Sequence, residues 1–339
     1  MSDWELFFKR TNYYVPLHAI EKRYNASIDF SILHWPESIS KIDGSKDIII
    51  LNVKEQYSIT DSIGLLEKQC QRPIEDIILL SDTVWPNTLF YYDNPNFFFA
   101  YTWFDCPVGV CEQVVEPKRY LFDFLVGYKR KQCDRLFQVF EQKGLLRNSL
   151  YKYDDMGNFD FDDMGEQFSI SWEKQGVEST IDMNTWASKF GTDSLNNHNA
   201  WPSRIVPKKA YEQTLFSVVR ESQFYFDTHL FYQPSEKTAK PILCKRLFFT
   251  LGAKGVNENY VKLGFRPYDY DNNTWDQLDK WQDRVDAFAD YISKLDQTYI
   301  LELYEKEKDN IEHNYKLATR PWAQQCLNFV LDRLASKYS

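Results

Sequence analysis

The sequence predicts an α/β protein whose parallel sheets are divided between two domains. Apolar runs of strand length alternate with stretches of helical periodicity along most of the chain, which is the order that parallel sheets require. Several of these runs, such as 47–53 (DIIILNV) and 76–80 (DIILL), are almost entirely apolar after a leading aspartate, which is typical of strands buried on both faces. A length of 339 residues favours about two domains.

Residues 1–115 are expected to form an N-terminal α/β domain. Buried strands are predicted over 47–53, 76–80 and 97–104, the last preceded by the turn signal Asn94-Pro95-Asn96. A helix is predicted over 61–71, with Asp61 as its N-cap. The first forty residues show no clear periodicity.

The same alternation restarts near residue 116 and defines a second expected domain, 116–272. A strand over 119–126 is followed by an amphipathic helix over 131–143, which Gly144 ends. The junction between them, Gly-Tyr-Lys-Arg-Lys, would offer backbone N–H groups and positive charge to an anion. Arg130 and Arg135 are therefore candidates for binding phosphate, since a guanidinium matches phosphate oxygens as a fork.

The most informative part of this second domain runs from residue 211 to residue 268. It predicts strands over 214–220, 247–251 and 265–268, with short helices that start after Ser235 and at Gly255. Beyond it, helices are predicted over 275–295, 298–315 and 321–337. This C-terminal part, 273–339, is expected to pack on the sheets, with one helix crossing back to the first domain.

Composition and charge exclude several classes of protein. The chain carries a net charge of −9, which disfavours a globally basic nucleic-acid binder, and cations gather locally, as at Lys237, Lys240, Lys245 and Arg246. No stretch approaches the ~20 apolar residues of a membrane span, and no secretion signal is recognised, so we expect a cytoplasmic protein. If the protein is viral, this means the host cytoplasm.

Metal and redox motifs are weak. The six cysteines lack zinc spacing and are expected to be reduced. The acidic stretch 151–165 lacks the ligand spacing of a calcium loop and is interpreted as a solvated loop. There is no GxGxxG, GxxxxGK[ST], HExxH or GxSxG motif, so the usual dinucleotide, P-loop, zincin and serine-hydrolase classes lose support.

Two short motifs resemble a known family. The segment FSVVRES (216–222), followed by Ser235-Glu236-Lys237-Thr238, is similar to the donor-binding segment of fucosyltransferase-like glycosyltransferases, including uncharacterised virus-encoded relatives. In that family a Phe-Glu-Asn-Ser strand end precedes a Thr-Glu-Lys helix start, so this chain departs from the pattern at both places. The resemblance covers about residues 120–271.

The resemblance implies a fold, a reaction and a set of binding residues. Such enzymes have two Rossmann-like domains facing across a cleft, the GT-B arrangement, and transfer a sugar from a nucleotide-diphosphate sugar to an acceptor hydroxyl. It implies that Glu236 contacts the ribose or base of the donor and that Lys237 contacts its diphosphate. The donor-binding candidates are Glu221, Ser235, Glu236, Lys237 and Lys240, together with Arg130 and Arg135. We expect inverting transfer, with no metal and with the sugar nucleotide as co-substrate.

The simpler interpretation is structural. Ser-Glu-Lys-Thr is also an ordinary helix start, with an N-cap and first-turn charges. Arg135 could lie on a solvated helix face, and Glu221 could cap a turn.

Inverting transfer needs a general base to accept the proton of the acceptor hydroxyl. Asp82 and Asp105, each at an expected strand end of the first domain, are the catalytic candidates, with His34 as a third. Strand-end aspartates are also common as turn residues.

Alternatives remain for the identity of the acceptor and for whether the protein is an enzyme. The acceptor could be a glycan or hydroxymethylated cytosine in DNA; the second would need a basic, aromatic surface and a steep salt dependence. A non-catalytic binding or structural protein with the same fold is the alternative from another class.

Overall fold

The computed structural model describes residues 15–33, 40–53, 63–81, 97–99, 110–126, 131–153, 156–159, 206–221, 224 and 235–338. These residues form two compact units. The first draws on residues 15–99 and 321–338, and the second on residues 110–320. The chain is a mixed α/β protein with predominantly parallel sheets and C-terminal helices, as the alternation of apolar runs predicts.

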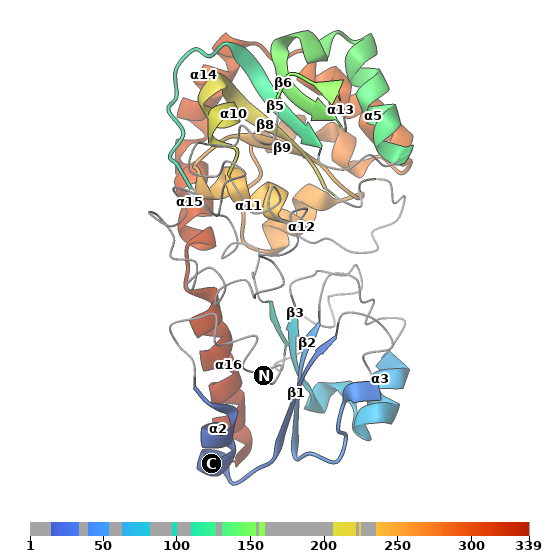
Figure 1. The fold of residues 1–339 in the computed structure, drawn as a ribbon, viewed down its shortest axis with the longest axis vertical. Coiled ribbons are helices and arrows are strands. Elements are labelled where there is room, and N and C mark those ends of the chain that lie inside the picture. Colours follow the sequence, from blue (N-terminus) through green and yellow to red (C-terminus); the bar gives the residue numbers. More distant parts are fainter. Residues whose placement is uncertain are drawn as a thin grey trace, which may run out of the picture. The chain divides into compact units, whose positions relative to one another are not determined.

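The first unit contains a four-stranded parallel sheet in the order β1-β2-β3-β4, whose strands are Ile28–Leu33, Ile48–Val53, Ile78–Ser81 and Phe97–Phe99. Helices α2 (Leu17–Tyr24) and α16 (Trp322–Tyr338) lie together on one face of this sheet, and α3 (Ile63–Cys70) lies on the other (Figure 1). Because side chains alternate along a strand, two separate cores result.

The core under α16 joins the two ends of the described chain. Ile28, Ile50 and Leu80 of the sheet pack against Leu327 and Val330 of α16 in one buried cluster. Burying a side chain of this kind contributes about 1.5–3 kcal/mol. The last helix of the sequence is thus an integral part of the first unit.

The second unit contains a five-stranded sheet in the order β7-β6-β5-β8-β9. The strands are Tyr120–Val126 (β5), Ser149–Tyr153 (β6), Met156–Gly157 (β7), Thr214–Arg220 (β8) and Phe248–Leu251 (β9). All neighbours are parallel except β7, which forms a hairpin with β6.

Helices cover both faces of this second sheet (Figure 1). On one face, Phe140 of α5 (Lys131–Gln142) contacts Phe122 of β5 and Phe288 of α13 (Trp281–Ile292). On the other face, Tyr260 of α12 (Val256–Lys262) contacts Phe248 of β9. The remaining helices are α10 (Lys208–Gln213), α11 (Glu236–Leu243), α14 (Gln297–Lys306) and α15 (Lys308–Ala318), and short 3-10 turns occur at Ile74–Asp76, Leu145–Asn148, Tyr270–Asn272 and Thr274–Gln277.

Three expectations about local structure are wrong. Residues 265–268 form no strand, because the side chain of Asn314 on α15 takes both backbone groups of Arg266, at 2.8 Å each, and Pro267 has no N–H to donate. The helices expected over 275–295 and 298–315 are each divided in two, the second at Glu307. Tyr151–Tyr153, expected in a loop, belong to β6.

In the part of the chain that the structure describes, no helix is both long enough and apolar enough to cross a bilayer.

Candidate functional site

The strand order of the second sheet identifies the edge at which a ligand would bind. The chain runs from β5 through α5 to β6 on one side of β5, whereas β8 and β9 lie on its other side. The connection therefore reverses direction between β5 and β8. In open α/β sheets, ligands bind beyond the carboxyl ends of the strands at such a switch point. Arg220 ends β8, so the carboxyl end of β8 is the place to examine.

Glu221 follows β8 directly and ties the strand end to helix α11. Its backbone N–H donates to the carbonyl of Leu251, at the end of β9, at 2.9 Å. Its buried carboxylate accepts from the Ser235 hydroxyl at 2.7 Å, from the Ser235 N–H at 3.3 Å and from the Thr238 hydroxyl at 2.6 Å. The Thr238 hydroxyl also lies 2.7 Å from the hydroxyl of Tyr260 on α12. Glu221 is thus engaged in fixing the start of α11.

Ser235 is the N-cap of α11. Its backbone is extended, and its hydroxyl oxygen accepts from the N–H of Lys237 at 3.2 Å. The capping predicted from the Ser-Glu-Lys-Thr pattern is therefore confirmed. Capping and ligand binding are compatible, because a cap satisfies only some of the N–H groups at a helix start.

Three charged residues of α11 are here named the α11 charge group: Glu236 and Lys237 at the start of the helix, and Lys240 one turn further along. The Lys237 amine lies 2.9 Å from the Glu236 carboxylate, and only 9% of Glu236 and 8% of Lys240 is exposed. Charges that only solvate a helix start are normally exposed, so this burial separates the α11 charge group from ordinary first-turn charges.

Burial and mutual charge shift the acidity of this group. Burial alone would raise the pKa of Glu236, but the positive charges of Lys237 and Lys240 outweigh it, and the pKa lies below its ordinary value. Burial lowers the pKa of Lys240 to about 8, although Glu236 opposes the shift. A buried amine of this kind would gain from an added negative charge.

Of the remaining candidates from the sequence, the structure describes Arg135, and it does not lie at the start of α11. Arg135 lies on α5 and donates two hydrogen bonds of 2.9 Å to the carboxylate of Asp286 on α13, so it links the two helices on the opposite face of the sheet from α12. Arg130, Asp82, Asp105 and His34 lie outside the described residues.

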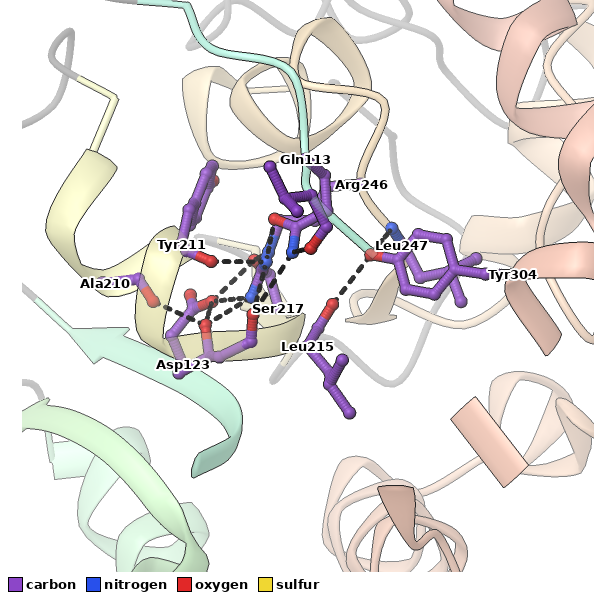
Figure 2. A network of polar contacts seen from close by, with 11 residues as sticks. Gln113, Asp123, Ala210, Tyr211, Leu215, Ser217, Arg246, Leu247 and Tyr304 are labelled. Atoms are coloured by element: carbon purple, nitrogen blue, oxygen red, sulfur yellow. Dashed lines mark hydrogen bonds and ion pairs between the residues drawn. The ribbon is translucent and has the colours of Figure 1, made fainter. Parts of the chain in front are cut away.

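Arg246 does not form a ligand-binding cluster with the neighbouring lysines, although all of them are close together in the sequence. It lies before β9 and is fully buried. Its guanidinium donates to Asp123 at 2.8 Å and to the Ser217 hydroxyl at 2.9 Å, and these bonds join β5, β8 and the start of β9 (Figure 2). Arg246 therefore stabilises the sheet and is not a candidate for ligand binding.

Further bonds complete this network. Arg246 donates to the Thr214 carbonyl at 2.9 Å. It also donates to the Gln113 side chain at 2.5 Å, and its guanidinium lies over the ring of Tyr211 (Figure 2). No local pattern reveals the pairing of Arg246 with Asp123, because 123 residues separate them.

A small cavity of about 10 Å³ lies elsewhere in the second unit, between β9, α12 and the segment 265–268. This volume is about what a single water molecule needs, so the cavity is not a nucleotide site. Among the described residues, no group of three or more His, Cys, Asp or Glu side chains is placed to hold a metal ion.

No protein-family model matches the sequence, and no curated protein matches it.

Proposed function

We propose that this protein is a glycosyltransferase that binds a nucleotide-diphosphate sugar at the start of α11 and transfers the sugar to an acceptor hydroxyl. The α11 charge group is the observation that carries the proposal. It combines a buried carboxylate and a lysine at a helix start with a second, buried lysine one turn further along, after the strand that borders the switch point.

The chemistry of sugar transfer suits these residues. The leaving nucleoside diphosphate gains negative charge in the transition state, and lysine amines and helix N–H groups held in place beforehand stabilise that charge. Lys237, whose side chain is 29% exposed, is the residue that we assign to the diphosphate, with Lys240 behind it. Glu236 is assigned to the ribose hydroxyls, because a carboxylate accepts hydrogen bonds from these hydroxyls in other nucleotide sites.

The proposal includes the two-domain GT-B arrangement of the family that the motifs resemble, with the first unit supplying the acceptor side. Asp82 and Asp105 remain its candidates for the general base. The acceptor hydroxyl would lose its proton to one of them as the sugar is transferred.

Binding is tested with a panel of nucleoside diphosphates, by thermal shift and then by calorimetry. A ligand that binds the folded state and not the unfolded state raises the melting temperature. Lys237→Ala should weaken the preferred nucleotide about ten- to a hundredfold, the loss expected for one hydrogen bond to a charged group. Lys262→Ala is the matched control, because it removes a lysine that pairs with Glu258 on the exposed face of α12. If no nucleoside diphosphate shifts the melting temperature, the proposal is wrong.

Catalysis is tested separately with sugar nucleotides. The unaltered protein should release nucleoside diphosphate slowly by hydrolysis, and faster with an acceptor. If one of Asp82 and Asp105 is the base, its replacement by Asn should lower kcat and leave nucleotide affinity unchanged. Nucleotide binding with no turnover on any sugar nucleotide would instead identify a non-catalytic binding protein.

A further inference from the structure

Two cysteines lie side by side at the other end of α11. Cys244 follows the last residue of the helix and is fully buried, while Cys111 is half-buried in the segment 110–118. One backbone hydrogen bond and one ion pair hold the segment 110–118 against the end of α11. The Gln113 N–H donates to the Cys244 carbonyl at 2.9 Å, and the Lys245 amine lies 3.3 Å from the Glu112 carboxylate.

The two thiols meet within this arrangement. They hydrogen-bond to one another, and the backbone N–H of Cys111 also points at the sulfur of Cys244. Both side chains pack into one small apolar cluster with Val206 and Tyr211. A disulfide requires neighbouring backbones and sulfurs that can approach to bonding distance, and here both segments are already held beside one another.

The environment makes the two thiols unequal. The hydrogen bond from Cys244 lowers the pKa of Cys111 to about 7 despite partial burial, and the charges of Lys208 and Arg246 add to the effect. The same contact, together with burial, raises the pKa of Cys244. Cys111 is thus the thiol that ionises near neutral pH and that solvent can reach, and the thiolate is the reactive form.

We propose that Cys111 and Cys244 form a reversible disulfide when the protein meets a small disulfide such as oxidised glutathione. The Cys111 thiolate attacks one glutathione sulfur and expels the other glutathione as a thiolate. Cys244 then loses its proton and attacks the Cys111 sulfur, which expels the second glutathione. Two protein thiols are oxidised and one small disulfide is reduced to two thiols.

The bond would tie segment 110–118 covalently to the end of α11. It would make the end of that helix sensitive to the thiol balance of its surroundings. This inference does not depend on the proposed function.

The test oxidises the full chain with graded ratios of oxidised to reduced glutathione, blocks the remaining thiols by alkylation and measures the intact mass. The unaltered protein should lose two hydrogens and two alkylation sites, and a reductant should reverse both. Cys244→Ser should instead accumulate a glutathione adduct on Cys111, because the second thiol is missing. Cys111→Ser should do neither.

Other cysteines provide the controls. Cys106→Ser should behave like the unaltered protein, although it lies close to Cys111 in sequence. Cys133→Ser tests a buried thiol on α5 and should also leave the reaction unchanged. The oxidised protein should melt at a higher temperature than the reduced one, because the bond closes a long loop.

Two results would overturn the inference. One is a stable glutathione adduct on Cys111 in the unaltered protein without ring closure. The other is loss of two hydrogens that persists in Cys244→Ser, which would assign the bond to another pair. Melting curves of both serine variants in the reduced state establish that they remain folded.

Discussion

The hydroxyl of Ser235 donates to the carboxylate of Glu221 at 2.7 Å, although 14 residues separate the two in the sequence. Glu221 follows β8 and Ser235 caps α11, so one buried side chain sets the position of the helix start against the strand edge. The α11 charge group begins at the next residue. The position of the group therefore depends on this contact.

Removing this carboxylate should destabilise the protein. Glu221→Ala leaves the Ser235 hydroxyl and N–H without this buried acceptor, and we expect the free energy of unfolding in urea to fall by about 1–3 kcal/mol. Glu258→Ala, on the exposed face of α12, should change it by less than about 0.5 kcal/mol. Equal effects of the two variants would contradict the anchoring role.

The buried ion pair between Arg246 and Asp123 should be costly to break. Arg246→Met leaves a buried carboxylate without its charge partner, and we expect a loss of about 3–5 kcal/mol in unfolding free energy. Replacing both residues by apolar ones should recover part of this loss. Arg135→Met breaks an ion pair whose side chains are 40% and 44% exposed, and this control should cost about 0–1 kcal/mol.

Asp276 should make stability depend on pH. Burial raises its pKa from 3.8 to about 7, although the N–H of Asn257 favours the charged form. The folded state therefore holds its proton more tightly than the unfolded state. Stability from this residue is present below about pH 4 and is lost as the pH rises to about 7, by at most about 1.4 kcal/mol per pH unit.

The measurement is the unfolding free energy of the unaltered protein and of Asp276→Asn across that pH range. Asparagine keeps an oxygen that can accept from Asn257 but has no proton to titrate. The difference between the two proteins should change steadily with pH. A difference that stays constant would show that Asp276 titrates normally.

Lys240 should give the opposite trend at higher pH. Burial lowers its pKa from 10.5 to about 8, so the folded state releases this proton more readily than the unfolded state. The cost of burying the charge is full below pH 8 and is relieved as the pH rises to 10.5. Compared with Lys240→Met, the unaltered protein should gain stability over that interval.

The same amine offers a signature of phosphate binding. A bound diphosphate would raise the pKa of Lys240, because a nearby negative charge favours the charged amine. Binding near pH 8 should therefore take up protons, which calorimetry detects as a heat that depends on the ionisation enthalpy of the buffer. Lys240→Met should abolish the uptake. A buffer-independent heat in the unaltered protein would place the phosphate away from Lys240.

The sequence predicts those elements whose signals are local. The strand predicted over 214–220 coincides with β8, and all seven of its residues are buried. The Ser235 cap and the helix over 131–143 likewise depend on neighbouring residues alone, and the structure places α11 and α5 there.

Features that depend on residues far apart in the chain could not be predicted from the sequence. Strand β1, Ile28–Leu33, alternates apolar and polar residues over its first five positions. It lies within the first forty residues, which show no longer periodicity from which a strand could be predicted. The loss of a strand at 265–268 depends on Asn314, 48 residues away from Arg266. For the candidate site, the motif located the α11 charge group, but the role of Glu221 as an anchor required the contacts themselves.

The position of α16 affects how the chain folds as it is made. The ribosome releases residues in order, and early domains usually complete their folding first. Here Leu327 and Val330 come from the last helix, yet they fill the apolar core that begins with Ile28 and Ile50. During synthesis this face of the first unit's sheet stays uncovered until Leu327 and Val330 have left the ribosome, so the nascent first unit should benefit from protection by chaperones.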